Sequence, residues 1–554
     1  MIAQATASRF RCLAALLAAM ILCLAGCRRE PVPAAQGGSA GSTAGPRRGG
    51  TVVTGWAADP GGVNELIIPS SQPTNEMLFR VFLHLVEEQS DFDQHPPTFA
   101  PQLARSYDWS ADHKILTFHL RDDVVWSDGV PVTADDVRWT WQAQIHPDVI
   151  WDDADSKQWI TDVEVVDPHT VRFHFSRVYF KQLLDANEGV ILPKHAWEKI
   201  PFPEWRKSGD WFKQHLVVDG PFTIASWQPA QQVVLQRNER YYEKEFPRLD
   251  RVVMRLIPNQ SAGLNQLLNG ELDFMPQIAP GDVPRVKASP QLQLIAFWFN
   301  IYVTVGWNNE NPLFRDPEVR RALTLGIDRQ TIVDTLLGSY GRVADSPIIN
   351  LVWAHDDSIK PLPYDPAEAR RILAAKGWKD TNGDGVLDKG GKPFSFELIT
   401  NAGNQLRTDA TVMIQDQLKK IGVQAIPRQV EFNTLATRTT DGTFDAAMIG
   451  FTMDTSLDMR TTFHSQSIGD GANFSRFRNP EVDRLIEQMA NQPDVLAARP
   501  YLDQIQQIVH REQPVTFLWE SQRLTAVNKR VKDVKPTLAF SFANLKEWWV
   551  DPKP

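Results

Sequence analysis

Residues 103–141 have the sequence LARSYDWSADHKILTFHLRDDVVWSDGVPVTADDVRWTW, and this stretch decides the fold. Within it, Leu116, Phe118 and Leu120 alternate with polar residues, which predicts a strand with one apolar face. The run TADDV, residues 133–137, then opens a helix that we expect near 134–146. The stretch therefore predicts a strand followed closely by a helix.

The same alternation of strands and helices continues along the chain. A β-hairpin is expected at 161–176, where two alternating apolar segments flank the turn Asp167-Pro168-His169. Helix starts are indicated at Asp316-Pro317, Asp365-Pro366 and Asn479-Pro480, because each pair places a capping side chain before a proline. Further along, helices are expected at 317–337, 366–376, 480–491, 260–269, 408–421 and 495–511. Together these elements predict mixed α/β domains.

The composition is that of a globular protein, with 554 residues, 42% of them hydrophobic, and a formal net charge of -9. An acidic chain argues against nucleic acid as a partner, because phosphate binding needs a basic face. The sequence has no His-Glu-x-x-His metal motif and no cysteine after Cys27, and no His/Cys cluster supports a nickel or haem receptor. We therefore expect a protein that is not an enzyme and that needs no cofactor.

The first residues look like a bacterial lipoprotein signal. An apolar run that begins at Leu13 is too short to span a bilayer and ends in Leu24-Ala25-Gly26-Cys27, with Arg9 and Arg11 before it. The resemblance implies that residues 1–26 are removed and that Cys27 carries a lipid. An ordinary signal peptide with a chance cysteine is the alternative. Residues 27–49 are rich in Pro, Gly, Ser and Ala and indicate a flexible tether.

Residues 103–141 resemble the extracytoplasmic solute-binding proteins of family 5, the peptide and nickel class that feeds ABC importers. The matching positions are Phe118, Leu120, Arg121, Trp126, Asp128, Gly129, Thr133, Ala134, Asp136 and Val137. Four further stretches match in the same order, at 219–242, 311–333, 364–378 and 479–488. Most of these residues are expected to serve the scaffold rather than the ligand.

This resemblance implies a two-lobed periplasmic-binding-protein fold of class II, cluster C type, with an extra domain inserted in the first lobe. Two chain segments would cross the hinge, and the ligand would lie in the cleft between the lobes. The expected boundaries are 50–95, 216–299 and 526–554 for the first lobe, 96–215 for the inserted subdomain, and 300–525 for the second lobe. The resemblance also implies a monomer in the periplasmic space that is anchored to a membrane by lipid.

Asp454 is the leading candidate for ligand binding, because peptide-binding relatives pair an aspartate at a similar strand end with the ligand's amino terminus. FDAAMIGF, residues 444–451, is an apolar strand that places this acid at its end, where a carboxylate can bind an ammonium. The backbone of Phe451, Thr452 and Met453 is expected to contact the ligand main chain. A loop or helix-cap role for Asp454 is the alternative.

The opposite end of the ligand has two alternative sets of candidate partners. Dipeptide-binding relatives place an arginine after the strand that corresponds here to FSFELIT, residues 394–400, whereas Arg407 stands a few residues later. An amide pocket formed by Asn401 and Asn404 is equally consistent with the sequence.

Other candidates come from the start of each lobe. Trp307, followed by Asn308, could stack on a side chain or a sugar, or could fill the core. Ser71, together with Ser70, matches a main-chain contact in relatives.

Asp380, Asn382, Asp384 and Asp388 resemble the first nine positions of a calcium loop, but position 12 is Gly391 instead of glutamate. Such runs also form ordinary Asx-type turns, so we assign no metal site.

The leading hypothesis is a receptor that captures peptides and delivers them to the permease subunits of an ABC importer. The alternative within the family is an oligosaccharide receptor, which the 18 tryptophans suggest. A hydrolase using Asp454 and Asp458 is the alternative from another class.

Overall fold

The computed structural model describes residues 45–469 and 471–552. The expected signal segment, Cys27 and the tether as far as residue 44 lie outside the described residues. Among the residues described, no helix combines the length and the apolar character needed to cross a membrane.

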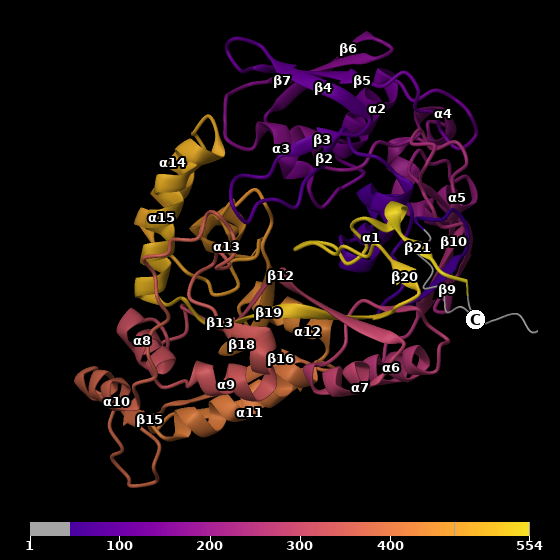
Figure 1. Cartoon of the computed structure of the whole chain (residues 1–554). Helices are drawn as coiled ribbons and strands as arrows, with labels where there is room; N and C mark the ends of the chain where they lie inside the picture. Colours follow the sequence, from indigo (N-terminus) through magenta and orange to yellow (C-terminus); the bar gives the residue numbers. More distant parts are fainter. Residues whose placement is uncertain (1–44, 470, 553–554) are drawn as a thin grey trace, which may run out of the picture. The chain divides into compact units, whose positions relative to one another are not determined.

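An 11-stranded sheet forms the centre of the structure, with the order β17-β16-β18-β12-β19-β11-β1-β10-β9-β8 and with β13 paired to β19 (Figure 1). Its strands are β1 (Thr51–Trp56), β8 (Phe222–Gln228), β9 (Gln232–Arg237), β10 (Arg251–Leu256), β11 (Phe274–Met275), β12 (Leu292–Trp307), β13 (Gly341–Val343), β16 (Ser395–Asn401), β17 (Gln424–Val430), β18 (Ala446–Thr452) and β19 (Val515–Asn528). Strands from early and late parts of the chain therefore share one sheet.

β12 and β19 join the two lobes. β12 has 16 residues and β19 has 14, and the two strands pair antiparallel along most of their length. The first half of β12 lies beside the part of β19 that also pairs with β11, while the second half pairs with β18. The register shifts between Trp298 and Tyr302, where one half passes into the other. The predicted two-lobed fold is confirmed, whereas the exact lobe boundaries stay a prediction.

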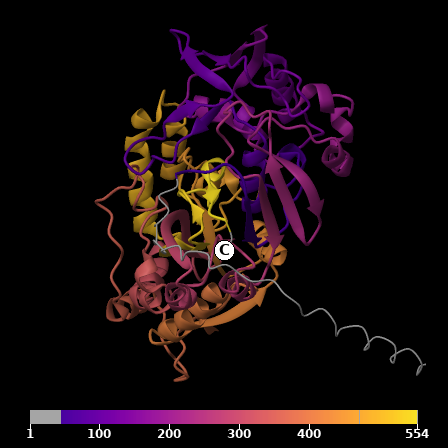
Figure 2. The same ribbon diagram turned by 45° about the vertical axis from the view of Figure 1, so that its right-hand side comes forward.

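A separate four-stranded antiparallel sheet, in the order β4-β5-β7-β6, forms within the first part of the chain. Its strands are β4 (Ala104–Trp109), β5 (Ile115–Leu120), β6 (Ile160–Asp167) and β7 (Thr170–Phe175), so the predicted hairpin is confirmed. Figures 1 and 2 both place this sheet at the opposite end of the described structure from α10 (Pro366–Ala375) and α11 (Gln405–Lys419). Short two-stranded sheets are formed by β2 (Val86–Glu88) with β3 (Phe99–Pro101), β14 (Asp388–Lys389) with β15 (Lys392–Pro393), and β20 (Val531–Lys532) with β21 (Trp549–Val550).

The predicted helices form, with two informative differences. The expected helix 317–337 is two helices, because Gly326 ends the first and the Asp328 carboxylate caps the second. The helix expected at 408–421 begins earlier, at Gln405, because the Asn404 side chain accepts from Arg407 N at 3.1 Å. The other helices are α1 (Gln72–Val81), α2 (Ala134–Gln144), α3 (Gln182–Asn187), α4 (Lys194–Trp197), α5 (Gly209–Gln214), α6 (Gln260–Leu268), α7 (Val283–Ala288), α8 (Pro317–Leu325), α9 (Arg329–Leu336), α12 (Phe432–Asp441), α13 (Arg460–Phe463), α14 (Pro480–Met489) and α15 (Val495–Glu512).

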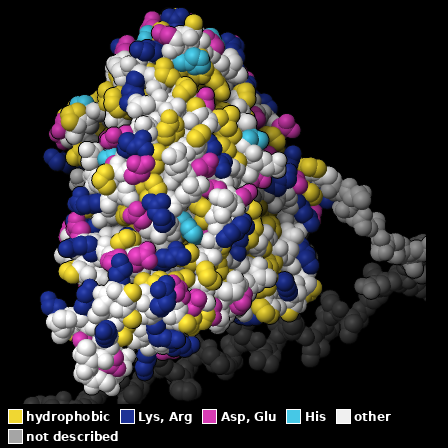
Figure 3. Space-filling view, turned by 90° about the vertical axis from the view of Figure 1, so that its left-hand side faces the viewer, with side chains coloured by type: hydrophobic (Ala, Val, Ile, Leu, Met, Phe, Trp, Pro, Cys, Tyr) yellow, Lys and Arg dark blue, Asp and Glu magenta, His cyan; other side chains and the backbone are white. Residues whose placement is uncertain are grey.

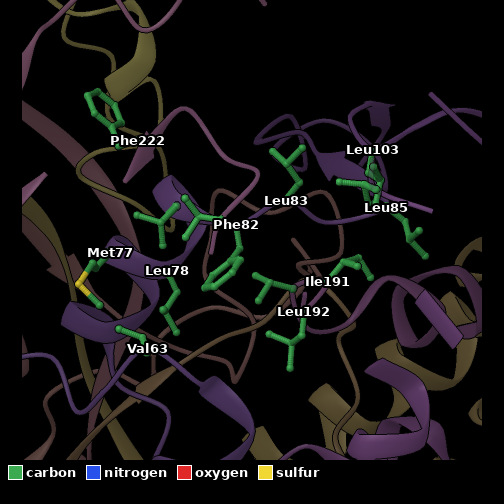
Figure 4. Packing of buried hydrophobic residues seen from close by; sticks show 14 of the residues in the cluster. Val63, Met77, Leu78, Phe82, Leu83, Leu85, Leu103, Ile191, Leu192 and Phe222 are labelled. Atoms are coloured by element: carbon green, nitrogen blue, oxygen red, sulfur yellow. The ribbon is translucent and has the colours of Figure 1, made fainter. Parts of the chain in front are cut away.

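The largest apolar core belongs to the first lobe and its inserted sheet. Phe82, Leu83, Ile191 and Leu192 come from segments far apart in the sequence and pack in one cluster (Figure 4). The Phe82 ring also meets Trp197 edge to face at 6.1 Å between ring centroids. Residues 45–554 contain no cysteine, so no disulfide can form within the lobe. Burial of apolar side chains therefore stabilises it.

Phe82→Ala tests the importance of this core. Phe82 is fully buried, and removing its ring should lower the free energy of unfolding by about 3–5 kcal/mol because a cavity remains. Chemical denaturation would measure the loss, with Phe432→Ala as the control because Phe432 is 63% exposed. A loss as small as that of the control would contradict this view of the core.

Candidate ligand-binding site

The site forms where the parallel strands β16 and β18 end. The two strands pair only at Leu398 with Ala446 and at Ile399 with Ala447, and then they diverge. The other edge of β18 is paired with β12 along residues 446–452. Within the described residues, the edge of β18 from 448 to 452 that faces away from β12 therefore has no strand partner. Carboxyl ends of diverging parallel strands are a common place for a ligand.

Asp454 follows this free edge. Asn300 extends the pairing past the strand, since Met453 N donates to Asn300 O at 2.8 Å and Asn300 Nδ2 donates to Met453 O at 2.7 Å. Asp454 Oδ1 accepts from Ser456 Oγ at 2.6 Å and from Leu457 N at 3.1 Å. Among the described residues, none donates to Asp454 Oδ2, and the residue is exposed. The Asp454 carboxylate thus stabilises its own loop through Oδ1, while Oδ2 can still accept a hydrogen bond from a ligand.

Three carboxyl groups of the first lobe lie close enough to Asp454 to feel its charge. Burial, together with the charge of Asp454, raises the pKa of Glu88 to about 7. Burial also raises the pKa of Glu188 to about 7, with Asp153 and Asp454 adding to the effect. For Asp153, burial raises the pKa, and the charges of Asp152 and Asp454 act in the same direction. Because the shifts share Asp454 as a cause, the two lobes bring like charges together at this end of the cleft.

A small cavity of about 60 Å³ lies among these groups on the first lobe. Burial raises the pKa of Glu65 in its wall to about 8, although Val190 N donates to the carboxylate at 2.6 Å. The residues that line the cavity are Glu65, Ile68, Pro69, Ser70, Thr74, Asn75, Phe79, Trp151, Asp152, Asp153 and Glu188. Ser71 lies beside it as the amino-terminal cap of α1, where its hydroxyl accepts from Thr74 N at 3.4 Å.

Arg407 bridges the ends of the two diverging strands. Its Nη1 donates to Asn401 Oδ1 at 2.9 Å, at the end of β16. A Cβ atom added to Gly450 of β18 would lie 2.3 Å from Arg407 Nη2, so the guanidinium rests directly on that glycine. Burial lowers the pKa of Arg407, and no ion pair to it is found in the described chain. Asn401 and Asn404 both bond to Arg407. Asn404 Oδ1 accepts from the backbone N of Arg407 as the amino-terminal cap of α11.

Trp307 and Asn308 lie at the other end of β18. Trp307 pairs with Ala446, the first residue of that strand, while Ile301 pairs with Thr452, its last. Trp307 is fully buried and its Nε1 donates to Thr516 Oγ1 at 3.1 Å, so its role is core packing. Asn308 Nδ2 donates to Phe444 O at 2.8 Å and lines an open groove of about 450 Å³. The structure does not bring these two residues to Asp454.

The residues of the calcium-like loop bond to the loop itself. Asp380 accepts from Gly383 N at 2.6 Å and from Gly385 N at 2.9 Å, and Asn382 Nδ2 donates to Asp384 Oδ2 at 2.9 Å. Asp388 Oδ2 accepts from the backbone and hydroxyl of Thr381. Among the residues described, no group of three or more acidic, histidine or cysteine side chains could hold a metal ion. These are the contacts of Asx-type turns.

Calcium should therefore leave the thermal stability unchanged. A bound ion would raise the unfolding temperature through mass action, whereas the loop's own N–H groups already satisfy these oxygens. Thermal unfolding with chelator, and then with millimolar calcium, would measure any difference. An increase of several degrees on adding calcium would contradict this assignment.

No local pattern in the sequence predicts the carboxylates of the first lobe as part of the site. Glu88, Asp153 and Glu188 come from three separate segments, and only the fold brings them close enough to Asp454 to feel its charge. Acidic and basic side chains are otherwise interspersed over the face shown in Figure 3.

Comparison with known proteins agrees with this architecture. Residues 98–473 match the model of bacterial extracellular solute-binding proteins, family 5 Middle. The chain is 30% identical over 513 residues to the oligopeptide-binding protein AppA of Bacillus subtilis (strain 168), which covers 91% of this chain and 92% of the relative. It is 26% identical over 431 residues to the periplasmic oligopeptide-binding protein OppA of Escherichia coli (strain K12), with 72% and 74% covered.

The likeness extends to a solved structure, that of AppA from Bacillus subtilis in complex with a nonapeptide. The TM-score is 0.80 at 29% identity, and the match covers 92% of this chain and 100% of the AppA chain. The family model alone spans more than half of the sequence. This chain belongs to the bacterial extracellular solute-binding proteins of family 5.

Proposed function

We propose that this protein captures peptides in the cleft between its lobes and delivers them to an ABC importer. The observation that carries the proposal is the edge of β18 that has no strand partner among the described residues, with a carboxylate at one end and, beside it, a guanidinium that forms no ion pair with them. An extended peptide presents a row of N–H and C=O groups that can add to such an edge. It also carries the two opposite charges that Asp454 and Arg407 would receive.

The two ends have different electrostatic character. Near Asp454 the first lobe contributes Glu88, Asp153 and Glu188, which together favour a positive charge. Near Gly450, within the described residues, the only side chain that bonds to the Arg407 guanidinium is that of the neutral Asn401. A free peptide, with an ammonium at one end and a carboxylate at the other, matches this polarity in one orientation.

The relatives support the same class of ligand. AppA and OppA are named oligopeptide-binding proteins, and AppA has been solved with a nonapeptide. Trp307, one candidate for stacking on a sugar, is fully buried, which favours a peptide over an oligosaccharide at this position. We further infer that a lipid on Cys27 anchors the protein to a membrane of the cell envelope, which rests on the sequence motif. That the protein is a monomer rests only on its resemblance to family 5.

Asp454→Asn should weaken the binding of a peptide that has a free amino terminus by about 10- to 100-fold. The reason is that a hydrogen bond to a charged group contributes about 1.5–3 kcal/mol. Calorimetric titration of the protein without its signal and tether would measure this, after unfolding and refolding to remove bound ligand. Asp441→Asn is a suitable control, because Asp441 is exposed in the same lobe. Equal binding of free and acetylated peptides, or binding of oligosaccharides only, would contradict the proposal.

Arg407→Met should remove the preference for a free carboxyl terminus. In the native protein we expect a peptide acid to bind at least about 10-fold more tightly than its amide, because a charge-assisted hydrogen bond is lost in the amide. The variant should bind both forms alike. Arg371→Met is the control, since Arg371 pairs with Glu368 on the surface of α10. An acid preference that survives in Arg407→Met would exclude this role.

A further inference from the structure

Asp454 begins a short loop, residues 454–459, that has an internal chain of hydrogen bonds. Ser456 Oγ donates to Asp454 Oδ1 at 2.6 Å and accepts from Asp458 N at 3.2 Å. Leu457 N also donates to Asp454 Oδ1, and Leu457 has a φ of 56° although it is 3% exposed. A non-glycine residue in this left-handed region is strained and persists only where its surroundings hold it. The orientation of Asp454 therefore depends on the rest of the loop.

The first lobe holds this loop from outside. Lys181 Nζ, from the residue that precedes α3, lies 3.3 Å from Asp458 Oδ2. The Thr455 side chain lies close enough to Glu88, at the end of β2, to lower the pKa of that carboxyl, although burial raises it more. Phe92 and Phe180 belong to the same apolar cluster as Leu457. An ion pair from the first lobe thus reaches the loop, and residues of the first lobe share an apolar cluster with Leu457.

The ammonium of Lys181 remains charged in this position. Burial opposes the charged form, but the carboxylates of Asp185, Asp458 and Asp454 outweigh it and raise the pKa of Lys181. The Lys181 and Asp458 side chains are 23% and 19% exposed, so solvent screens the pair less than it screens a surface ion pair. Lys181 also pairs with Asp185 at 3.6 Å, one turn further along its own segment.

We propose that Lys181 is a positioning residue for the ligand's amino terminus: through Asp458 and Ser456 it fixes Asp454, so that the ammonium site is complete only when the lobes are closed. This inference rests on the proposed function, because it concerns the same carboxylate. A ligand ammonium and lobe closure would then favour each other through one hydrogen-bonded chain. Lobe closure would thereby select peptides with a free amino terminus.

A plain interlobe ion pair predicts a different result from a positioning residue. An ion pair that only stabilises closure contributes equally to every ligand that the closed cleft holds. A residue that orients Asp454 contributes only to ligands that carry the ammonium. The ratio of affinities for a free and an acetylated form of one peptide separates the two cases.

The experiment compares native protein, Lys181→Gln and Asp458→Asn in calorimetric titrations with a tetrapeptide and its acetylated form. Asparagine at 458 can still accept from Arg460 N, as Asp458 Oδ1 does at 2.9 Å, so this variant removes the charge and keeps the turn. Both variants should lower the free-to-acetylated affinity ratio by about 5- to 10-fold, while the acetylated peptide binds nearly as before. Lys194→Gln is the matched control, because Lys194 pairs with Asp135 within the first lobe.

Equal weakening of both peptide forms in the variants, or no weakening of either, would overturn the positioning role while leaving peptide binding intact. Failure of the native protein to distinguish the two forms would instead contradict the proposed function.

A measurement on the closed protein tests the inference independently. With the free tetrapeptide bound at saturation, hydrogen exchange of the segment 454–460 should be faster in Lys181→Gln than in the native protein and in Lys194→Gln, because the strained loop loses its external support. Unchanged exchange in Lys181→Gln would overturn the inference.

Discussion

The pairing of β12 with β19 is the constraint on which the rest of the structure depends. These strands belong to both lobes. β19 pairs with β11 in the first lobe, and β12 pairs with β18 in the second. The register shift between Trp298 and Tyr302 interrupts the ladder at the point of transition. A β-ladder is stiff where its register is regular and bends where it is interrupted. We therefore expect any change in the angle between the lobes to occur at this interruption, while each lobe keeps its own part of the sheet.

The same pairing sets the ligand site. β12 occupies one edge of β18 along its whole length and leaves the other edge open where β16 turns away. Asp454, Gly450 and the Arg407 guanidinium lie along that open edge because the strand order puts β18 between β12 and β16. Backbone pairing thus places Asp454 and Arg407, the two charged groups proposed to bind the ends of the ligand. Side-chain caps then orient them.

The sequence predicted the parts of this arrangement that depend on local chemistry. The capped helices and the hairpin at 160–175 formed as expected, because capping side chains, prolines and alternation act over a few residues. Asp454 could be singled out because it directly follows an apolar strand. Trp307 could not be assigned, since a tryptophan in a strand suits a core as well as a cleft, and only the register shows it facing Thr516.

Other features depend on contacts that no local pattern carries. Arg407 lies in the first turn of α11 because that helix starts at Gln405. Its guanidinium can lie directly against β18 because Gly450 has no side chain there. That glycine has a wider consequence. Any larger residue there would push the guanidinium off the strand end, yet it would leave the hydrogen-bonded ladder with β12 in place. The range of ligands accepted by such a receptor could thus diverge during evolution through a position that need not touch the ligand.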